Sequence, residues 1–396
     1  MSHPRPTDLD AKLSDQLRGI PRSGIRDFFE LVIGRADVIS LGVGEPDKPT
    51  PWPIREAAIR SLEKGQTSYT SNLGLESLRV GIAGYVKEHF HTSYDPKTEI
   101  LVTVGVSEAL DLAFRAVLNP GDEVIFHQPC YVSYSPTVTM AYGVPVPVNT
   151  RLEDNFALRA SDVAKVITPK SKVVVLNFPT NPTGAIEPVD ELEKIAALCV
   201  KHDLLCFTDE IYSELLYDNG QHQSIVEFPG MRERTVLLHG FSKAFAMTGW
   251  RLGYACSPPP LTAAMMKIHQ YSMLCAPIMS QMAAVEALKL GAAAYEPMRQ
   301  SYEERRNFVV SRLNAMGLHC FNPGGAFYVF PDVSSTGLSG KEFAMKLLEE
   351  KSVAVVPGGA FGPSGENCVR CCYATAPDLL VKAMDGMEAF VKARRK

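Results

Sequence analysis

Residues 172–178 read KVVVLNF, and residues 204–209 read LLCFTD. Both runs are continuously apolar rather than alternating, which is typical of strands buried on both faces of a sheet. Helix-like segments lie between such runs, for example at 107–118 and 188–202. Further runs of strand length are ILVTV (100–104), EVIFH (123–127), TVLLHG (235–240) and LGYACS (252–257). The pattern predicts an α/β fold whose central sheet is mostly parallel and carries helices on both sides.

The two ends of the chain depart from this pattern. Residues 1–45 are polar, interrupted by prolines and weakly periodic, so we expect an arm that packs on a small C-terminal domain or on a neighbouring subunit. Later in the chain, an amphipathic stretch at 295–316 is followed by short strand-like pieces and two helical segments. These differences predict a large domain at 46–290 and a smaller α/β C-terminal domain at 291–396.

The composition is that of an ordinary globular protein of 396 residues, of which 46% are hydrophobic and 21% charged. The chain has 40 Lys and Arg and 44 Asp and Glu, and the resulting net charge of −4 argues against a nucleic-acid partner. No stretch reaches the ~18 consecutive apolar residues of a membrane helix, and the N-terminal segment lacks the apolar core of a signal peptide. Nine cysteines, an odd number, fit reduced thiols, so we expect a cytoplasmic protein without a membrane partner.

Two short motifs suggest other kinds of site. Gly42-Val43-Gly44 resembles the start of a dinucleotide-binding turn, but Pro46 lies inside that turn and Asp47 takes the place of its third small residue. Cys368 and Cys371 have the spacing of zinc ligands, but no second pair lies near them in sequence, so we expect no metal site.

A third motif, Gly105-Val106-Ser107-Glu108-Ala109, lies between a predicted strand and a predicted helix, like the nucleophile turn of serine hydrolases. Asp209 and His239 follow it in the order that those enzymes use, so a hydrolase stays open at this point. As an ordinary strand-to-helix turn, the same segment would expose backbone amides at the start of a helix, where anions bind.

The strongest local signal is SKAFAMTGWRLG at residues 242–253. Lys243 follows the buried run TVLLHG with no acidic residue beside it. Phe241, Phe245 and Met247 flank this lysine, so we expect its ammonium group to be partly desolvated, which lowers the pKa from ~10.4 and exposes a nucleophilic amine. Such an amine forms Schiff bases with carbonyl compounds.

Two more motifs, NPTG at 181–184 and DEIY at 209–212, precede this lysine. Together with SKxFxMTGxRxG at 242–253, they resemble the class I/II aminotransferases of pyridoxal-phosphate (PLP) fold type I. The resemblance extends from LGVGEPD at 41–47 to CVRCCYA at 368–374, essentially the whole chain. It implies the fold type I of PLP-dependent transferases, in which a large domain with a mostly parallel sheet is joined to a smaller α/β domain.

The resemblance also implies roles around the PLP ring. Lys243 would hold the cofactor covalently and would move the proton between substrate and cofactor. Asp209 would face the pyridine nitrogen and keep it protonated. Tyr212 and Asn181 would donate hydrogen bonds to the phenolic oxygen, and Tyr131 would stack on the ring.

The PLP phosphate would lie at the start of the helix that follows the first strand run. The resemblance places the amides of Val106 and Ser107 and the guanidinium of Arg251 there. Gly240 departs from the family pattern, because many relatives carry a phosphate-binding serine at that position. Ser242, beside the lysine, is the candidate that could compensate.

Contacts with the substrate and with a second subunit complete the expected site. Arg370 matches the family's C-terminal arginine, whose planar fork binds the α-carboxylate shared by all amino acids. The backbone amide of Gly44 would approach the same carboxylate, and Asn181 would contribute to substrate binding as well. Tyr69 matches a tyrosine that reaches the phosphate from the neighbouring subunit, so the active unit would be a homodimer.

The implied reaction transfers an amino group from an amino acid to a 2-oxo acid in a ping-pong cycle, with 2-oxoglutarate as the expected acceptor. The N-terminal motifs are most similar to the broad-specificity and aromatic branch of the family, and aspartate is the competing donor. Tyr131, Tyr134, Phe28 and Phe327 could supply apolar walls for the donor side chain. A serine hydrolase acting through Ser107 and a non-catalytic protein that keeps the fold are the alternatives from other classes.

Overall fold

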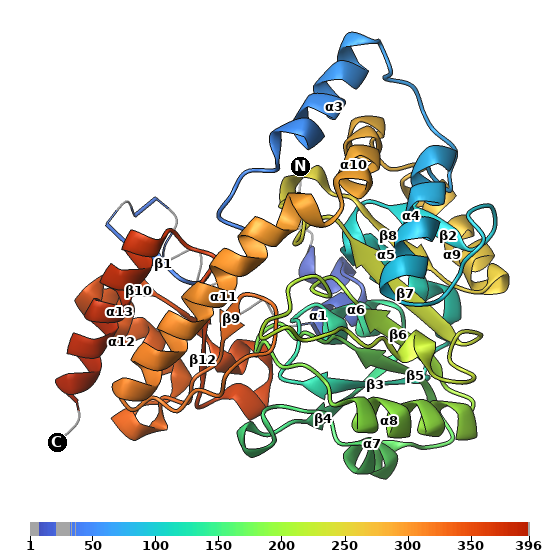
Figure 1. Cartoon of the computed structure of the whole chain (residues 1–396). Helices are drawn as coiled ribbons and strands as arrows, with labels where there is room; N and C mark the ends of the chain where they lie inside the picture. The colour runs from blue at the N-terminus through green and yellow to red at the C-terminus, as the bar shows by residue number, and fades with distance from the viewer. Residues whose placement is uncertain (1–7, 21–31, 33, 36, 395–396) are drawn as a thin grey trace, which may run out of the picture.

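The computed structural model describes residues 8–20, 32, 34–35 and 37–394. Its centre is a seven-stranded sheet (Figure 1) with the spatial strand order β2-β8-β7-β6-β5-β3-β4. Only β8 runs antiparallel to its two neighbours, so the prediction of a mostly parallel sheet is confirmed. The strands are β2 (Ile100–Thr103), β3 (Glu123–Gln128), β4 (Val144–Asn149), β5 (Ser171–Leu176), β6 (Leu205–Asp209), β7 (Thr235–Gly240) and β8 (Gly253–Cys256).

Each of the six predicted runs forms one of these strands, and β4 is the strand that the sequence did not reveal. Its sequence VPVPVN contains Pro145 and Pro147, which lack the amide hydrogen that a central strand must donate. The strand lies at the edge of the sheet and pairs only with β3, so prolines are tolerated there. A run that is broken by prolines and has only one buried residue carries no signal for a buried strand.

Helices cover both faces of the sheet, as predicted (Figure 1). In β5, Val173 and Val175 pack in one core with α5 and α9, whereas Val174 and Leu176 pack in the opposite core with α7 and α8. The β2–β8 end is covered by α4, α10 and α3. These helices are α3 (Trp52–Glu63), α4 (Glu76–His89), α5 (Gly105–Val117), α6 (Tyr134–Met140), α7 (Ala160–Val166), α8 (Val189–Lys201), α9 (Pro259–Ser272) and α10 (Ile278–Leu290).

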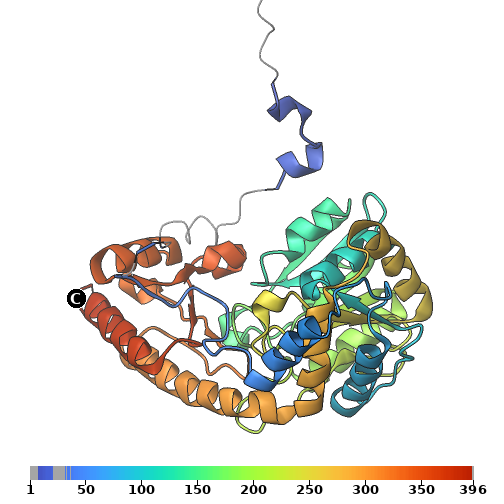
Figure 2. The same cartoon turned by 90° about the horizontal axis from the view of Figure 1, so that it is seen from above.

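The C-terminal part forms a separate layer beside the large sheet (Figures 1 and 2). The long helix α11 (Ala292–Ala315) leads into it, and α12 (Gly340–Lys351) and α13 (Pro377–Lys392) pack on its core. Its antiparallel sheet has the order β11-β12-β9, with strands β11 (Val356–Pro357), β12 (Val369–Cys372) and β9 (Tyr328–Val329). A smaller α/β part beside the large sheet is therefore present, as predicted for the fold.

The end of the expected N-terminal arm pairs with a strand of this C-terminal layer. Strand β1 (Ile39–Ser40) pairs in parallel with β10 (Val353–Ala354), and the short helix α1 (Asp15–Arg18) precedes it in the chain. The boundaries at residues 45 and 290 stay predictions. Phe28, a candidate wall of the substrate site, lies outside the described residues.

The described residues contain neither a candidate membrane span nor a candidate metal cluster. None of their helices is long and apolar enough to cross a membrane. They also hold no group of three or more His, Cys, Asp or Glu side chains that could bind a metal ion. The nine cysteines are free thiols, and all but Cys275 are buried.

Candidate active site

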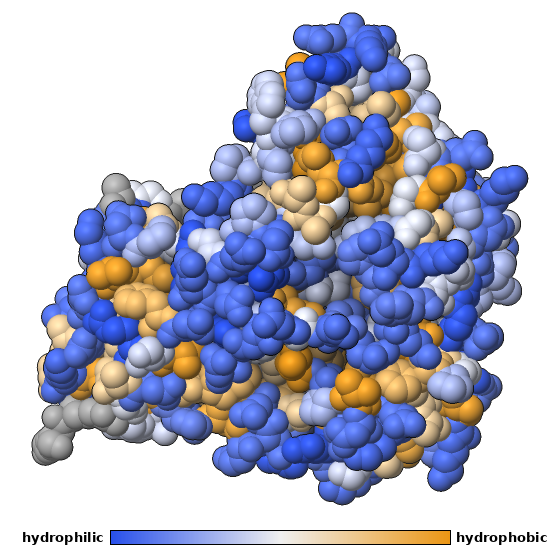
Figure 3. All heavy atoms as spheres, in the orientation of Figure 1, coloured by the Kyte–Doolittle hydropathy of each residue, from blue (hydrophilic) through white to orange (hydrophobic). Residues whose placement is uncertain are grey.

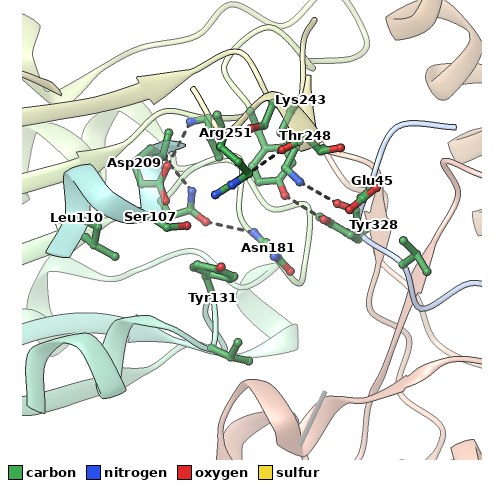
Figure 4. Close-up of a pocket in the computed structure, with 18 of the residues that line it drawn as sticks. Glu45, Ser107, Leu110, Tyr131, Asn181, Asp209, Lys243, Thr248, Arg251 and Tyr328 are labelled. Atoms are coloured by element: carbon green, nitrogen blue, oxygen red, sulfur yellow. Dashed lines mark hydrogen bonds between the residues drawn. The ribbon is translucent and has the colours of Figure 1, made fainter. Parts of the chain in front are cut away.

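A cavity of about 660 Å³ lies at the carboxyl ends of β3, β5, β6 and β7, where they face the C-terminal layer (Figure 4). In sheets of this kind the strand ends that adjoin a crossover are the usual ligand site. The cavity brings together nearly all side chains that the sequence predicted for the site. These are Gly44, Val106, Ser107, Tyr131, Asn181, Asp209, Tyr212, Ser242, Lys243, Arg251 and Arg370.

Lys243 lies in the loop after β7 and points its amine into this cavity (Figure 4). Its Nζ donates a hydrogen bond to the carbonyl oxygen of Gly44 at 2.8 Å, and no carboxylate in the described chain forms an ion pair with it. Burial lowers the pKa of Lys243 from 10.5 to about 8. The amine is therefore easily deprotonated, and a neutral amine is the nucleophile that a carbonyl compound needs.

The apolar surroundings of Lys243 differ from those expected. Phe241 and Phe245 belong to the core beneath α4 and α10. The rings nearest to the Lys243 Nζ are instead Tyr212 at 5.8 Å and Phe327 at 5.7 Å, measured to the ring centroids. Both rings belong to residues that are distant from Lys243 in sequence.

Asp209 lies at the end of β6 and is buried. It accepts hydrogen bonds from the Tyr134 hydroxyl at 2.8 Å and from the Ile211 amide at 3.4 Å. Burial raises its pKa from 3.8 to about 6, and no cation within the described residues forms an ion pair with it. A buried carboxylate in this condition fits a ligand that brings its own positive charge, as the protonated ring nitrogen of PLP does.

Arg370 enters the cavity from β12 in the C-terminal layer. Its two terminal nitrogens donate to the Asn181 side-chain oxygen at 3.0 Å and to the Gly42 carbonyl oxygen at 2.6 Å. The Nε atom is buried without a hydrogen-bond partner, and Arg370 forms no ion pair with any described carboxylate. Leaving a buried guanidinium without an anion is costly, so the arrangement fits a carboxylate-bearing ligand.

The first turn of α5 and Arg251 form the anion-binding end of the cavity. Gly105 has a φ of +78°, and a Cβ at this position would lie 2.7 Å from the Nη2 of Arg251. A Cβ on Gly253 would lie 2.6 Å from the amide nitrogen of Val106. Because Gly105 and Gly253 lack a Cβ, Arg251 and β8 can both lie close to the first turn of α5. The Arg251 guanidinium and the amides of this turn both attract a phosphate.

Gly240, where many relatives carry serine, is closely packed in this chain. A Cβ there would lie 3.0 Å from the Cα of Gly253 and 3.1 Å from the carbonyl oxygen of Leu252. A side chain at this position would therefore require β7 or β8 to shift. Ser242 lines the cavity and is available to contact the cofactor instead.

Tyr69 does not line the cavity, and neither do Tyr134 and Phe327, which the sequence suggested as candidate walls for the donor side chain. Tyr69 was expected to contact the phosphate of a neighbouring subunit. It lies between α3 and α4, and 82% of its surface is exposed. Its expected contact with a second subunit stays a prediction.

The hydrolase alternative required His239 to act with Ser107. His239 is buried and instead bonds Ser213 at 3.0 Å and Glu214 at 2.9 Å. Among the described residues, its hydrogen bonds do not include Ser107. The site of a serine hydrolase is therefore not assembled, and Ser107 lies in the anion-binding turn.

Sequence reasoning missed two residues that shape the site. Tyr134 was expected as an apolar wall but donates a hydrogen bond to Asp209. Tyr328, within the strand-like piece AFYVF, lines the cavity and lies 2.9 Å from the Tyr212 hydroxyl. The strand-like piece AFYVF could have indicated Tyr328, because it pairs with the strand that carries Arg370. Which strands pair, however, cannot be deduced from one sequence. Asn177, expected only as a loop support, donates to the Asp209 carbonyl oxygen at 2.9 Å.

Comparisons with known proteins agree with this geometry. Residues 36–385 match the family described as aminotransferase class I and II. The chain is 52% identical, over 97% of its length and 99% of the relative, to a Bacillus subtilis (strain 168) protein named as an aminotransferase, YugH. It is 44% identical to the aromatic-amino-acid aminotransferase 2 of Thermococcus litoralis, over 97% of this chain and 99% of that one. The solved aspartate aminotransferase of Thermus thermophilus with maleate is 39% identical, with a TM-score of 0.90 over 95% and 99% of the two chains.

The family match covers most of the chain, and these relatives are covered almost in full. The resemblance found in the motifs, the fold type and the need for PLP are thereby confirmed. The chain belongs to the class I and II aminotransferases and is a PLP-dependent transferase.

Proposed function

We propose that this protein transfers the amino group of aromatic or broadly chosen amino acids to 2-oxoglutarate in a ping-pong cycle. The observation that carries the proposal is that one cavity holds an easily deprotonated lysine, a buried acid and an arginine, and that neither the acid nor the arginine forms an ion pair with any described residue. When bound, PLP supplies an electron sink for the charge left at the substrate Cα.

The residues at the ring end of the cavity would have separate tasks. The Lys243 amine would hold the cofactor and would then take the proton from the substrate Cα and deliver it to the C4′ carbon of the cofactor. Asp209 keeps the ring nitrogen protonated, and Tyr134 holds the Asp209 carboxylate in place. Tyr212 and Asn181 donate hydrogen bonds to the phenolic oxygen, while Tyr131 stacks on the ring.

The phosphate end is formed by groups from two places in the chain. The amides of Val106 and Ser107, the Ser107 and Ser242 hydroxyls and the Arg251 guanidinium would bind the phosphate oxygens. Tyr69 would add a contact from the neighbouring subunit of a homodimer, and its exposure in the single chain leaves it free to do so.

Arg370 would bind the α-carboxylate of the substrate through two parallel hydrogen bonds, with the Gly44 amide beside it and Asn181 holding the guanidinium. The described residues that line the cavity include three cations, Lys243, Arg251 and Arg370, and each already has a task. An aspartate donor needs a fourth cation for its second carboxylate, and the described lining of this chain offers none. This favours aromatic and other uncharged side chains over aspartate.

The test is a panel of amino donors assayed with 2-oxoglutarate and compared by kcat/KM. Phenylalanine and tyrosine are expected to exceed aspartate by at least about tenfold, because a dicarboxylate without a second cation loses at least ~1.4 kcal/mol. A preference for aspartate would overturn the proposed donor class. Lys243→Ala is expected to retain the far-UV circular dichroism of the folded chain and to lose turnover, and a variant that still transfers amino groups would refute the role of the lysine.

A further inference from the structure

Tyr328 is a buried side chain of the cavity to which the proposed chemistry gives no task. It belongs to β9 in the C-terminal layer and extends toward the large sheet (Figure 4). Its hydroxyl oxygen lies 2.9 Å from the Tyr212 hydroxyl oxygen, and its ring lies 4.7 Å from the guanidinium carbon of Arg370. One tyrosine therefore contacts both a proposed cofactor ligand and the proposed carboxylate ligand.

Each of the two tyrosine hydroxyls carries one proton. Burial raises the pKa of both Tyr212 and Tyr328 above 10.0, so both are protonated at neutral pH. A tyrosine hydroxyl can donate only one hydrogen bond. If Tyr212 donates its hydrogen bond to the phenolic oxygen of PLP, it cannot also donate one to Tyr328. The hydrogen bond between the tyrosines must then be donated by Tyr328.

We propose that Tyr328 is a positioning residue whose hydroxyl donates a hydrogen bond to the Tyr212 hydroxyl and thereby directs the Tyr212 proton toward the cofactor. The inference rests on the proposed place of Tyr212 at the phenolic oxygen. A hydroxyl that accepts one hydrogen bond donates a second more strongly, so Tyr328 makes Tyr212 a better donor.

The surroundings fix the Tyr328 hydroxyl in this role. A Cβ on Gly44 would lie 2.5 Å from the Tyr328 oxygen, so the glycine leaves the space that the hydroxyl occupies. The guanidinium carbon of Arg370 lies 4.7 Å from the ring centroid of Tyr328 and 4.8 Å from that of Phe361. The Cys372 thiol and the Tyr131 hydroxyl are the other titratable groups near Tyr328, and both raise its pKa.

The test is a spectroscopic pH titration of the PLP-loaded protein without substrate. Donation to the phenolic oxygen favours the form of the cofactor linkage that has lost its proton, so a weaker donor raises the apparent pKa of the visible absorbance change. Tyr328→Phe keeps the ring against Arg370 and removes only the hydroxyl. We expect it to raise this apparent pKa by about half to one pH unit, the loss expected for one hydrogen bond.

A double-mutant cycle shows whether Tyr328 acts through Tyr212. Tyr212→Phe should raise the same apparent pKa, and adding Tyr328→Phe to it should cause no further change. Equal shifts in both backgrounds, or no shift by Tyr328→Phe where Tyr212→Phe does shift, would overturn the inference. If Tyr212→Phe causes no shift, the proposed place of Tyr212 is wrong and the inference falls with it.

Two further variants separate the hydroxyl pair from general effects. Tyr373→Phe is the matched control, because its hydroxyl lies 3.4 Å from that of Tyr217 in a second buried pair outside the cavity. It should leave the titration unchanged, and a shift as large as that of Tyr328→Phe would count against the proposal. Gly44→Ala should displace the Tyr328 hydroxyl and raise the apparent pKa. This rise should vanish in a Tyr212→Phe background, whereas a direct effect through the hydrogen bond from Lys243 to Gly44 would persist there.

Discussion

Lys243 is the side chain whose chemistry depends most directly on its surroundings. With the cofactor removed, its amine is expected to react with an acylating reagent along a pH curve whose midpoint is about 8, because burial disfavours the ammonium form. Below the midpoint the amine is protonated and inert, and above it the amine is free. The rate at each pH is measured by mass spectrometry of the peptide that contains Lys243.

Lys194 provides an internal reference in the same experiment. It is paired with Asp190 and Glu191, and these bonds raise its pKa above 10.5. Its acylation should therefore begin at a higher pH than that of Lys243. Coinciding curves for the two lysines would show that the active-site amine is not desolvated.

Residues that follow a buried strand were the predictable part of the site. Asp209 ends one strong apolar run and Lys243 follows another, so their place at one edge of the sheet follows from the sequence. Tyr328 and Tyr134 were not predictable in their roles, because a hydroxyl's partner depends on packing between segments far apart in the chain. Arg370 was assigned only by resemblance, since its apolar strand carries no sign of a ligand.

At the scale of elements, the close contact between β8 and the start of α5 shapes the phosphate end. Gly253→Ala would place a Cβ within 2.6 Å of the Val106 nitrogen and 2.7 Å of the Gly105 carbonyl carbon. Both are backbone atoms, so the first turn of α5 must move. We expect the affinity for PLP to fall by about tenfold or more, measured by fluorescence titration of the cofactor-free protein.

Gly84→Ala is the control for this substitution. Gly84 lies within α4, and a Cβ there meets no heavy atom within 4 Å. The change should leave PLP affinity unaltered and raise the free energy of unfolding by up to about 1 kcal/mol, because alanine favours the helix. If both variants bind PLP as well as the parent protein does, the phosphate end does not depend on the contact between β8 and α5.

Elements with a strong apolar pattern were predictable, and elements that depend on their neighbours were not. Strands β5, β6 and β7 are buried on both faces and were found from their sequence alone. The two-residue strands β1 and β10 exist because they pair with each other, although their sequences are more than 300 residues apart. Neither strand is long enough to show an alternation of apolar and polar residues.

At the scale of the whole molecule, the surface around α3 exposes several large apolar side chains to solvent. Helix α3 exposes Trp52, Ile59 and Leu62, and Tyr69 follows it with 82% of its surface exposed. Figure 3 shows apolar atoms gathered between α3 and α10. Large exposed apolar patches are typical of surfaces that another protein covers, which supports the proposed homodimer.

A hybrid dimer tests whether Tyr69 completes the site of the other subunit. Tyr69→Phe and Lys243→Ala are each expected to be impaired, since one weakens the phosphate contact and the other removes the amine. After unfolding and refolding of an equal mixture, each hybrid would have one site with both Lys243 and Tyr69 intact, about a quarter of all sites in the sample. Activity should rise toward about that fraction of the parent value. If Tyr69 acted within its own subunit, mixing would restore nothing, because no site would contain both residues.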